Sequence, residues 1–174
     1  MRAPFYSKQG FTLIEILIVC FIIGLLAVVL LANTRQGNNE TNLHFAAQNF
    51  ANVLKQARSM AANGKTAFDV ASGTNKIPAA YGVFISTNAV YYLFADQDGD
   101  GINDSAETLE TITLPEKITM DQLSGTILFQ TPGGETLVNG SGSGSLVVTF
   151  TNSSIGKSSA VSVYAGTGKI ESSF

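Results

Sequence analysis

The apolar and polar residues of this 174-residue chain form three successive patterns, and the first is a long apolar run. Every residue from 16 to 32 is apolar, counting glycine and cysteine, and with residues 11–15 the run reaches the roughly 20 residues that a helix needs to cross a bilayer. Arg2 and Lys8 precede it without an acid, which by the positive-inside rule keeps the N-terminus in the cytoplasm. The pattern predicts a membrane-spanning helix over residues 11–32.

The second pattern is an amphipathic continuation of this helix. Apolar residues recur at steps of three and four along one side, which is typical of a helix with one buried face. The predicted buried positions are Leu43, Ala46, Ala47, Phe50, Val53, Leu54, Ala57, Met60 and Ala61. Asn63 and Gly64 supply a stop signal. We expect a helix over residues 11–64, with a bend or melted turn at 35–41, where Gly and Asn are poor helix formers.

The third pattern, over residues 65–174, consists of short runs rich in β-branched and aromatic residues, separated by turn segments such as STN, PGG and NGSGSGS. Such runs are typical of strands. The predicted strands are residues 66–70, 81–86, 89–95, 108–114, 125–130, 145–151, 160–165 and 168–171. The order of elements predicts an α+β fold, with the long N-terminal hydrophobic helix packed on a C-terminal antiparallel β-sandwich or meander.

The amino-acid composition argues against several classes of function. The net charge of −3 gives no basic face of the kind that binds nucleic acid. The single cysteine, Cys20, cannot form an intramolecular disulfide, and a single histidine rules out multi-histidine metal sites. His44 lies between Leu43 and Phe45 with no serine or aspartate pattern that points to it as a base. We therefore do not expect an enzyme.

The segment KQGFTLIE, residues 8–15, places Glu15 in the apolar run, where a charge is costly. It resembles the prepilin peptidase signal of type IV pilins and type II secretion pseudopilins. The resemblance implies that residues 1–10 are a leader cut between Gly10 and Phe11, and that Phe11 is N-methylated. It also implies that in a filament Glu15 lies near the freed amino group of Phe11 in a neighbouring subunit, which offsets the desolvation of both charges. The alternative is a carboxylate tolerated near the lipid headgroups.

The segment LKQARSMAANGKTAFDV, residues 54–70, carries a second resemblance. It is similar to a pattern of the GspH/FimT group of minor pseudopilins and minor pilins, and SVYAGTGKIE, residues 162–171, resembles the final hairpin of that group. Many major pilins have a proline in the apolar helix, and its absence here favours a pseudopilin or minor pilin. Arg58 either pairs on the surface of the domain or has a function shared within the group.

Members of this group that take up DNA carry several arginines near the C-terminus. In this chain Lys157 and Lys169 are the candidate DNA-binding residues. Such a small number of cations gives little phosphate-driven affinity. We therefore do not expect nucleic acid as a partner.

The segment DQDGDGINDSAE, residues 96–107, matches the twelve-residue EF-hand calcium loop, with Gly101 at the sharp turn. The candidate ligands are the carboxylates of Asp96, Asp98, Asp100, Asp104 and Glu107 and the carbonyl group of Ile102. Oxygen ligands at this spacing favour Ca²⁺ over transition metals. Because the flanking runs are typical of strands, we expect one Ca²⁺ in a structural loop between strands. The alternative is a solvated acidic turn without an ion.

These observations predict a structural subunit, a minor pseudopilin or pilin of a type II secretion pseudopilus or a type IV pilus. Its parts would be a leader (1–10), a transmembrane and assembly helix (11–64) and an exported head (65–174). We expect a single span in the bacterial inner (cytoplasmic) membrane, with the head in the periplasm or at the cell surface. The expected partners are other pilin or pseudopilin subunits and prepilin peptidase. The alternative function is a pilus-anchored module that binds DNA or another surface ligand.

Overall fold

The structure is a computed structural model that describes residues 11–133 and 135–173, with the backbone alone for residues 30–36. The predicted leader, residues 1–10, lies outside the described residues, and so does Gly10 at the predicted cleavage site. The side chains of residues 30–32, at the end of the predicted membrane span, also lie outside them.

Helix α1 covers Leu13–Ala62 and has a defined start and end. At its start, the Thr12 hydroxyl oxygen accepts a hydrogen bond from the backbone N–H of Glu15 at 3.3 Å, which satisfies one of the free donors of the first turn. At its end, Gly64 has a φ of 55° and the Lys65 N–H donates to the Met60 carbonyl oxygen at 3.0 Å. This Schellman arrangement confirms the predicted stop.

Residues 35–41 are helical, so the melted turn predicted there is wrong. A glycine inside a helix costs only about 1 kcal/mol relative to alanine. Helix formation is cooperative once nucleated, and apolar turns with good helix propensity flank this segment on both sides. The flanking helical turns therefore keep these residues helical despite their low helix propensity.

The chain divides into two compact units, Met1–Asn38 and Asn39–Phe174, which we call the N-terminal unit and the head. In the N-terminal unit, the large apolar side chains of residues 11–29 are exposed on all sides of α1. No helix within the described residues is both long and apolar enough to cross a membrane.

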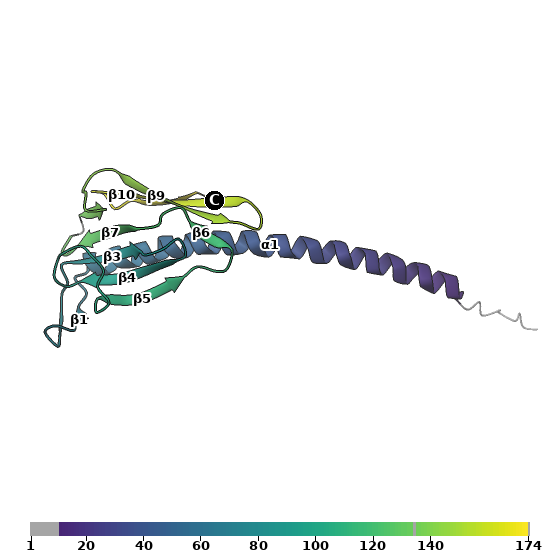
Figure 1. Cartoon of the computed structure of the whole chain (residues 1–174), viewed down its shortest axis with the longest axis horizontal. Coiled ribbons are helices and arrows are strands. Elements are labelled where there is room, and N and C mark those ends of the chain that lie inside the picture. Colours follow the sequence, from purple (N-terminus) through teal and green to yellow (C-terminus); the bar gives the residue numbers. More distant parts are fainter. Residues whose placement is uncertain (1–10, 134, 174) are drawn as a thin grey trace, which may run out of the picture. The chain divides into compact units, whose positions relative to one another are not determined.

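The described part of the head contains three antiparallel sheets (Figure 1). The five-stranded sheet has the order β5 (Thr108–Thr113), β4 (Val90–Asp96), β3 (Ala80–Ile85), β7 (Gly125–Gln130), β8 (Thr136–Val138). The four-stranded sheet has the order β11 (Ile170–Ser173), β10 (Lys157–Tyr164), β9 (Ser145–Asn152), β6 (Ile118–Met120). The small sheet pairs β1 (Ala67–Asp69) with β2 (Thr74–Lys76). The predicted α+β class is confirmed, whereas β2, β6 and β8 were not predicted.

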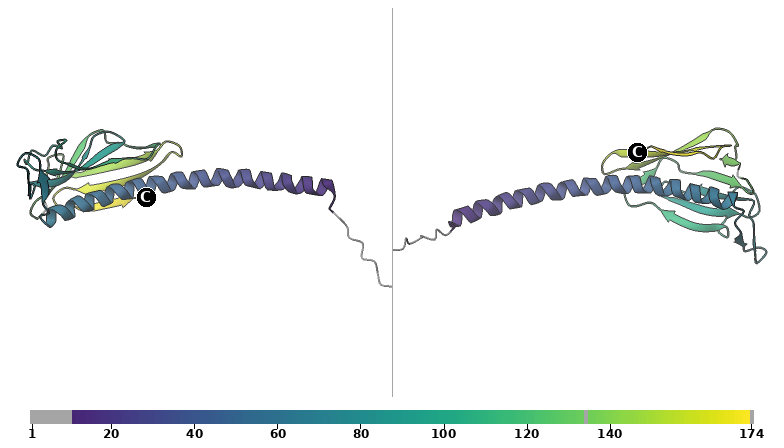
Figure 2. Two further views of the ribbon diagram at one scale, coloured as in Figure 1. Left: turned by 90° about the horizontal axis from the view of Figure 1, so that it is seen from below. Right: turned by 180° about the vertical axis from the view of Figure 1, so that it is seen from behind.

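One hydrophobic core joins the head part of α1 to both larger sheets, which form two layers in Figure 2. All nine helix positions predicted from periodicity are buried: Leu43, Ala46, Ala47, Phe50, Val53, Leu54, Ala57, Met60 and Ala61. Phe50 lies at the centre, with its ring edge-on to Tyr91 at 5.0 Å and tilted against Phe150 at 5.5 Å. The helix, β4 and β9 therefore meet at one aromatic cluster.

A second, smaller cluster covers the opposite face of the five-stranded sheet. It consists of Ala80, Phe94 and Leu128, with Phe84 and Leu137 packed against them. Because side chains alternate along a strand, these residues face away from the main core, which holds Tyr81, Val83 and Ile85 of the same strand β3. Both faces of the sheet are therefore covered by apolar residues at this end.

Gly82 permits this second cluster. A Cβ atom at Gly82 would lie 2.7 Å from a ring carbon of Phe94 and 2.8 Å from a methyl carbon of Leu128. Phe94 and Leu128 are its partners on the two neighbouring strands. The Phe94 ring can therefore lie over β3 only where that strand has no side chain.

We predict that Gly82→Ala destabilises the head by about 1–3 kcal/mol, the usual cost of overpacking. The measurement is thermal unfolding of the purified chain, followed by the near-ultraviolet circular dichroism of its buried tyrosines. Gly37→Ala is the control, since no described atom beyond its two chain neighbours and the backbone of its own helix lies within 4 Å of its Cβ position, and it should leave the head transition unchanged. Equal melting temperatures for the Gly82→Ala variant and the parent would contradict the close contact.

Candidate functional site

The predicted assembly residues lie at the start of α1. Phe11 is 79% exposed and precedes the capping residue Thr12, so it stands outside the helix. Glu15 is exposed in the first helical turn, where the unpaired N–H groups favour a negative charge. The sequence Thr-Leu-Ile-Glu has the spacing of a capping box, a signal from which the role of Thr12 could have been predicted.

The acidic loop, residues 96–107, connects β4 to β5, so the predicted flanking strands are confirmed. Its first aspartate organises the turn: the Asp96 carboxylate accepts hydrogen bonds from the N–H of Gly99 at 2.7 Å and of Gly101 at 3.2 Å. Both glycines have positive φ, 83° and 77°, in the region that favours glycine. The loop therefore wraps around the Asp96 carboxylate.

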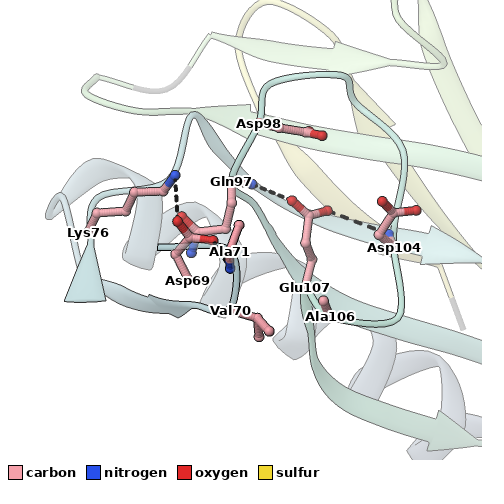
Figure 3. A pocket seen from close by; sticks show the side chains of 9 residues that line it. All are labelled: Asp69, Val70, Ala71, Lys76, Gln97, Asp98, Asp104, Ala106 and Glu107. Atoms are coloured by element: carbon pink, nitrogen blue, oxygen red, sulfur yellow. Dashed lines mark hydrogen bonds and ion pairs between the residues drawn. The ribbon is translucent and has the colours of Figure 1, made fainter. Parts of the chain in front are cut away.

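The last acid of the loop closes it. Glu107 accepts a hydrogen bond from the Gln97 N–H at 2.6 Å, and the Asp104 N–H lies 3.5 Å from its other oxygen. These contacts are drawn in Figure 3. The carboxylate of Glu107 therefore joins the two ends of the loop.

The loop brings together three of the five predicted carboxylate ligands. Carboxylate oxygens of Asp96, Asp98 and Glu107 all lie within 4.8 Å of one another. The carboxylates of Asp100 and Asp104 lie outside this group, and the Asp100 carboxylate accepts the Ile102 N–H at 2.7 Å. The arrangement can offer three carboxylate oxygens to a cation.

Burial makes this cluster electrostatically unfavourable. Asp96 is 2% exposed and Glu107 is 9% exposed. Burial raises the pKa of Asp96, and the charges of Asp98 and Asp100 raise it further, although hydrogen bonds from Gly99 and Gly101 oppose the shift. Burial also raises the pKa of Glu107, with a further contribution from Asp96 and Asp98. Negative charge in the folded loop is therefore costly, and a bound cation would offset the cost.

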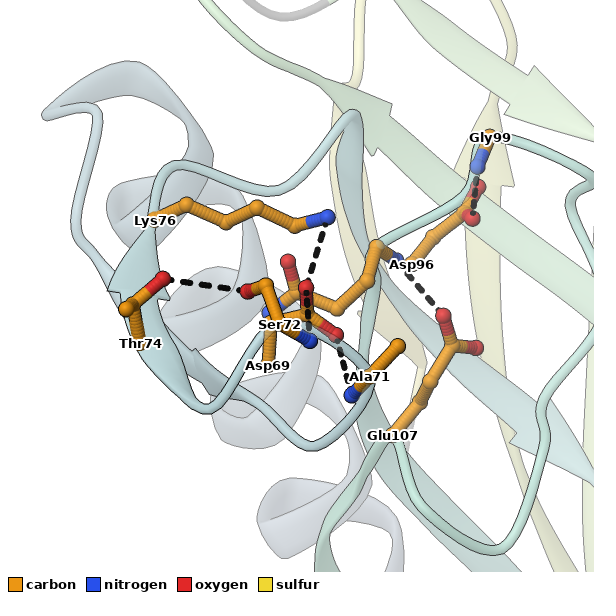
Figure 4. Close-up of polar contacts among 9 residues, drawn as sticks. Asp69, Ala71, Ser72, Thr74, Lys76, Asp96, Gly99 and Glu107 are labelled. Carbon is orange, nitrogen blue, oxygen red and sulfur yellow. Dashed lines mark hydrogen bonds and ion pairs between the residues drawn. The ribbon is translucent and has the colours of Figure 1, made fainter.

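The turn of the β1–β2 hairpin lies beside this loop, and the two line a cavity of about 180 Å³ (Figure 3). Asp69 anchors the turn by accepting the N–H groups of Ala71 at 3.0 Å and Ser72 at 3.2 Å, and it forms an ion pair with Lys76 at 2.9 Å (Figure 4). Hydrogen bonds from Ser72 and Lys76 hold the pKa of Asp69 well below its usual range. Asp69 is therefore a fixed anion beside the loop.

Gln97 is a residue of this site that the sequence pattern did not identify. The residue lines the same cavity, and both polar atoms of its side-chain amide are buried without a hydrogen-bond partner among the described residues.

The two candidate DNA-binding residues are both engaged by acids. Lys157 forms an ion pair with Glu40 at 2.8 Å, and Lys169 forms one with Glu171 at 2.5 Å. The hydrogen bond to Glu171 raises the pKa of Lys169, and the lysine also lies 5.8 Å from the centre of the Tyr164 ring. Each cation thus has a carboxylate within contact distance.

Arg58 pairs on the surface of the head. Its guanidinium donates a hydrogen bond to the Thr167 carbonyl oxygen at 3.1 Å, in the turn between β10 and β11. A Cβ atom at Gly168 would lie 3.2 Å from the Arg58 Nε and 2.5 Å from the Thr136 hydroxyl oxygen. The guanidinium therefore fixes the final hairpin against the helix, which supports the first of the two roles considered for Arg58.

A helix that begins with a capped acidic turn and has an apolar surface, followed along the chain by a head with two larger sheets, is typical of a pilin-type subunit. The family profile for the prokaryotic N-terminal methylation motif matches residues 6–31, and that for the type II transport protein GspH matches residues 46–167. The second match covers more than half of the chain, so the chain belongs to the GspH family. No curated protein and no solved structure matches it.

Family membership defines the class of function. The chain is a structural subunit of the pilin and pseudopilin type and not an enzyme. Membership also implies association with other pilin or pseudopilin subunits and processing by prepilin peptidase.

We predict that Arg58→Ala lowers the stability of the head by about 1 kcal/mol, because the Thr167 carbonyl loses its charged donor. Thermal unfolding of the full chain measures the effect. The control is Lys55→Ala, an exposed cation one turn earlier on α1, which should have little effect. A melting temperature for Arg58→Ala equal to that of Lys55→Ala would show that this hydrogen bond does not hold the hairpin.

Proposed function

We propose that this protein is a minor subunit of a type II secretion pseudopilus or a type IV pilus. It is anchored in the inner membrane by residues 11–32, is cut between Gly10 and Phe11, and carries its head outside the cytoplasm. The observation that supports this most directly is the N-terminal methylation motif, which runs into a helix that exposes apolar side chains on every side.

The exposed apolar surface of α1 supports assembly through this helix. Side chains such as Ile14, Phe21 and Leu25 are more than half exposed in the single chain. A helix that is apolar all round is stable only when lipid or other helices cover it. A subunit that is stored in a membrane and then bundled into a filament has one of these environments at each stage.

Glu15 provides the specific contact in this proposal. Cleavage before Phe11 creates a new amino group one residue before the cap of α1. An isolated carboxylate or ammonium is costly in an apolar bundle, whereas a pair between neighbouring subunits offsets that cost. The pair would also set the axial position of each new subunit, because it can form only where Phe11 of one chain meets Glu15 of the next.

The test is incorporation into filaments, in cells that contain prepilin peptidase and the partner subunits. Glu15→Gln keeps the size of the side chain and removes its charge, and we expect the incorporated fraction to fall by at least about tenfold. Glu110→Gln, an exposed acid on β5, is the control and should assemble normally.

N-terminal sequencing of the membrane pool of each variant shows whether processing has occurred. We expect every pool to begin at N-methylated Phe11, so that a defect can be assigned to assembly. Normal incorporation of Glu15→Gln would remove the charge pair from the proposal, and an uncut Met1 terminus in the parent would remove the prepilin assignment itself.

We also propose that the acidic loop holds one Ca²⁺ as a structural clamp between β4 and β5. Three observations support this: the EF-hand spacing of residues 96–107, the convergence of three carboxylates, and the burial of Asp96 and Glu107. A divalent cation would turn the mutual repulsion of these acids into attraction and stabilise the loop.

We predict that calorimetry of the full chain in detergent detects one Ca²⁺, with a Kd on the order of 10⁻⁴ to 10⁻³ M, as in other extracellular modules. Glu107→Gln should abolish the heat of binding, because it removes a central carboxylate. Glu110→Gln lies three residues away outside the ligand group and should bind as the parent does. Binding heat that persists in Glu107→Gln would exclude this site.

DNA capture gains no support from the head. Lys157 and Lys169 both pair with carboxylates, so a phosphate would have to compete with Glu40 and Glu171 for them. A subunit that contributes to the filament is the function that these observations favour.

A further inference from the structure

A groove of about 450 Å³ lies on the face of the five-stranded sheet that is opposite the main core. It is within the range of volumes found for small-ligand sites. Its lining comes from β3, β4, β5 and the acidic loop and consists of Phe84, Tyr92, Thr108, Thr111, Asn103 and Ser105. Nothing in the filament function accounts for this groove.

Two aromatic rings form its floor. Phe84 and Tyr92 are direct partners across β3 and β4, and their ring planes are inclined by only 10° with centroids 6.3 Å apart. Nearly parallel rings at this separation form an offset stack. Both residues are half-buried, so the stacked pair presents part of its aromatic surface to the groove, and we call this surface the platform.

The platform has a polar border on one side. Thr111 is the partner of Tyr92 on the edge strand β5, and Thr108 lies on the same strand. Asn103 and Ser105 come from the acidic loop. The Thr108 hydroxyl donates a hydrogen bond to the Asn103 side-chain oxygen at 3.1 Å. The hydroxyl groups of Ser105 and Thr111 can both donate and accept hydrogen bonds, so this border can match a ligand with many hydroxyl groups.

The charges in and around the groove favour an uncharged ligand over an anion. None of its six lining residues is Asp, Glu, Lys, Arg or His, and the adjoining loop carries the carboxylates of Asp98, Asp100 and Asp104. An anion such as a phosphate or an acidic peptide would be repelled, and a cationic ligand would find no carboxylate in the groove itself. An uncharged ligand fits this electrostatic environment.

We infer that this groove binds a neutral oligosaccharide, with a sugar ring packed against the aromatic surface of Phe84 and Tyr92. The apolar C–H face of a sugar ring would cover the platform, and its hydroxyl groups would reach the border. The site uses no residue of the assembly helix, so it goes beyond the proposed function and does not depend on it.

The experiment is isothermal titration calorimetry of the full chain with maltohexaose, cellohexaose and chitohexaose as probes. The detergent is zwitterionic and has no sugar headgroup, and the buffer contains calcium so that the loop with Asn103 and Ser105 is held. We expect saturable binding of at least one probe. Tyr92→Thr, which keeps a β-branched residue in the strand, should weaken it by about tenfold or more.

Two further variants complete the test. Tyr164→Thr removes a partly exposed tyrosine from the other sheet and should bind as the parent does. Thr111→Arg, at an exposed position, places a bulky side chain at the border and should also weaken binding, even if Tyr92→Thr does not fold. No binding of any probe, equal binding by Thr111→Arg and the parent, or binding of a proline-rich peptide instead of the sugars would overturn the inference.

Discussion

The burial of one apolar stripe of α1 against two sheets holds the head together. Each of the two larger sheets has an apolar inner face that it cannot cover alone. Phe50 and Leu54 are fully buried at the centre of the stripe, and Phe50 contacts aromatic residues of both layers, Tyr91 and Phe150. The helix is therefore the shared core element of the head, and the small contacts at its periphery, such as Arg58 with Thr167, set the final position of single strands.

Periodicity made the helix side of the main core predictable, because a period of 3.6 residues identifies a half-buried helix over many turns. Single short elements gave no such signal: β2, β6 and β8 have three residues each, too few to show alternation. The second cluster around Phe94 was also missed, since it depends on Gly82 lying under a ring from the neighbouring strand. Which residues of two neighbouring strands contact each other depends on the register of the strands. The sequence pattern of one strand does not determine this register.

For the acidic loop, too, one part of the structure could be predicted from the sequence and another part could not. Its residue spacing predicted a turn between two strands that carries oxygen ligands, and the flanking strands are present. The unequal burial of its acids could not be predicted, because it arises from the ends of the loop. Asp96 ends β4 and Glu107 immediately precedes β5, so both are packed against the sheet, whereas Asp98 and Asp100 lie between the two ends of the loop and are exposed. The energetic cost of charge is therefore concentrated on the two terminal acids.

In the proposed filament, the first turn of α1 would meet a local and an intermolecular requirement. Thr12 caps the helix, which leaves Phe11 outside it and in the proposed mature protein places the new amino group at the positive end of the helix dipole. A positive charge there is unfavourable within its own chain. Glu15 in the same turn offsets part of this effect, yet it is three residues inside the helix and exposed to neighbours. The proposed pairing between subunits therefore relieves two unfavourable charges at once, and this would make the filament the state in which the N-terminus is most stable.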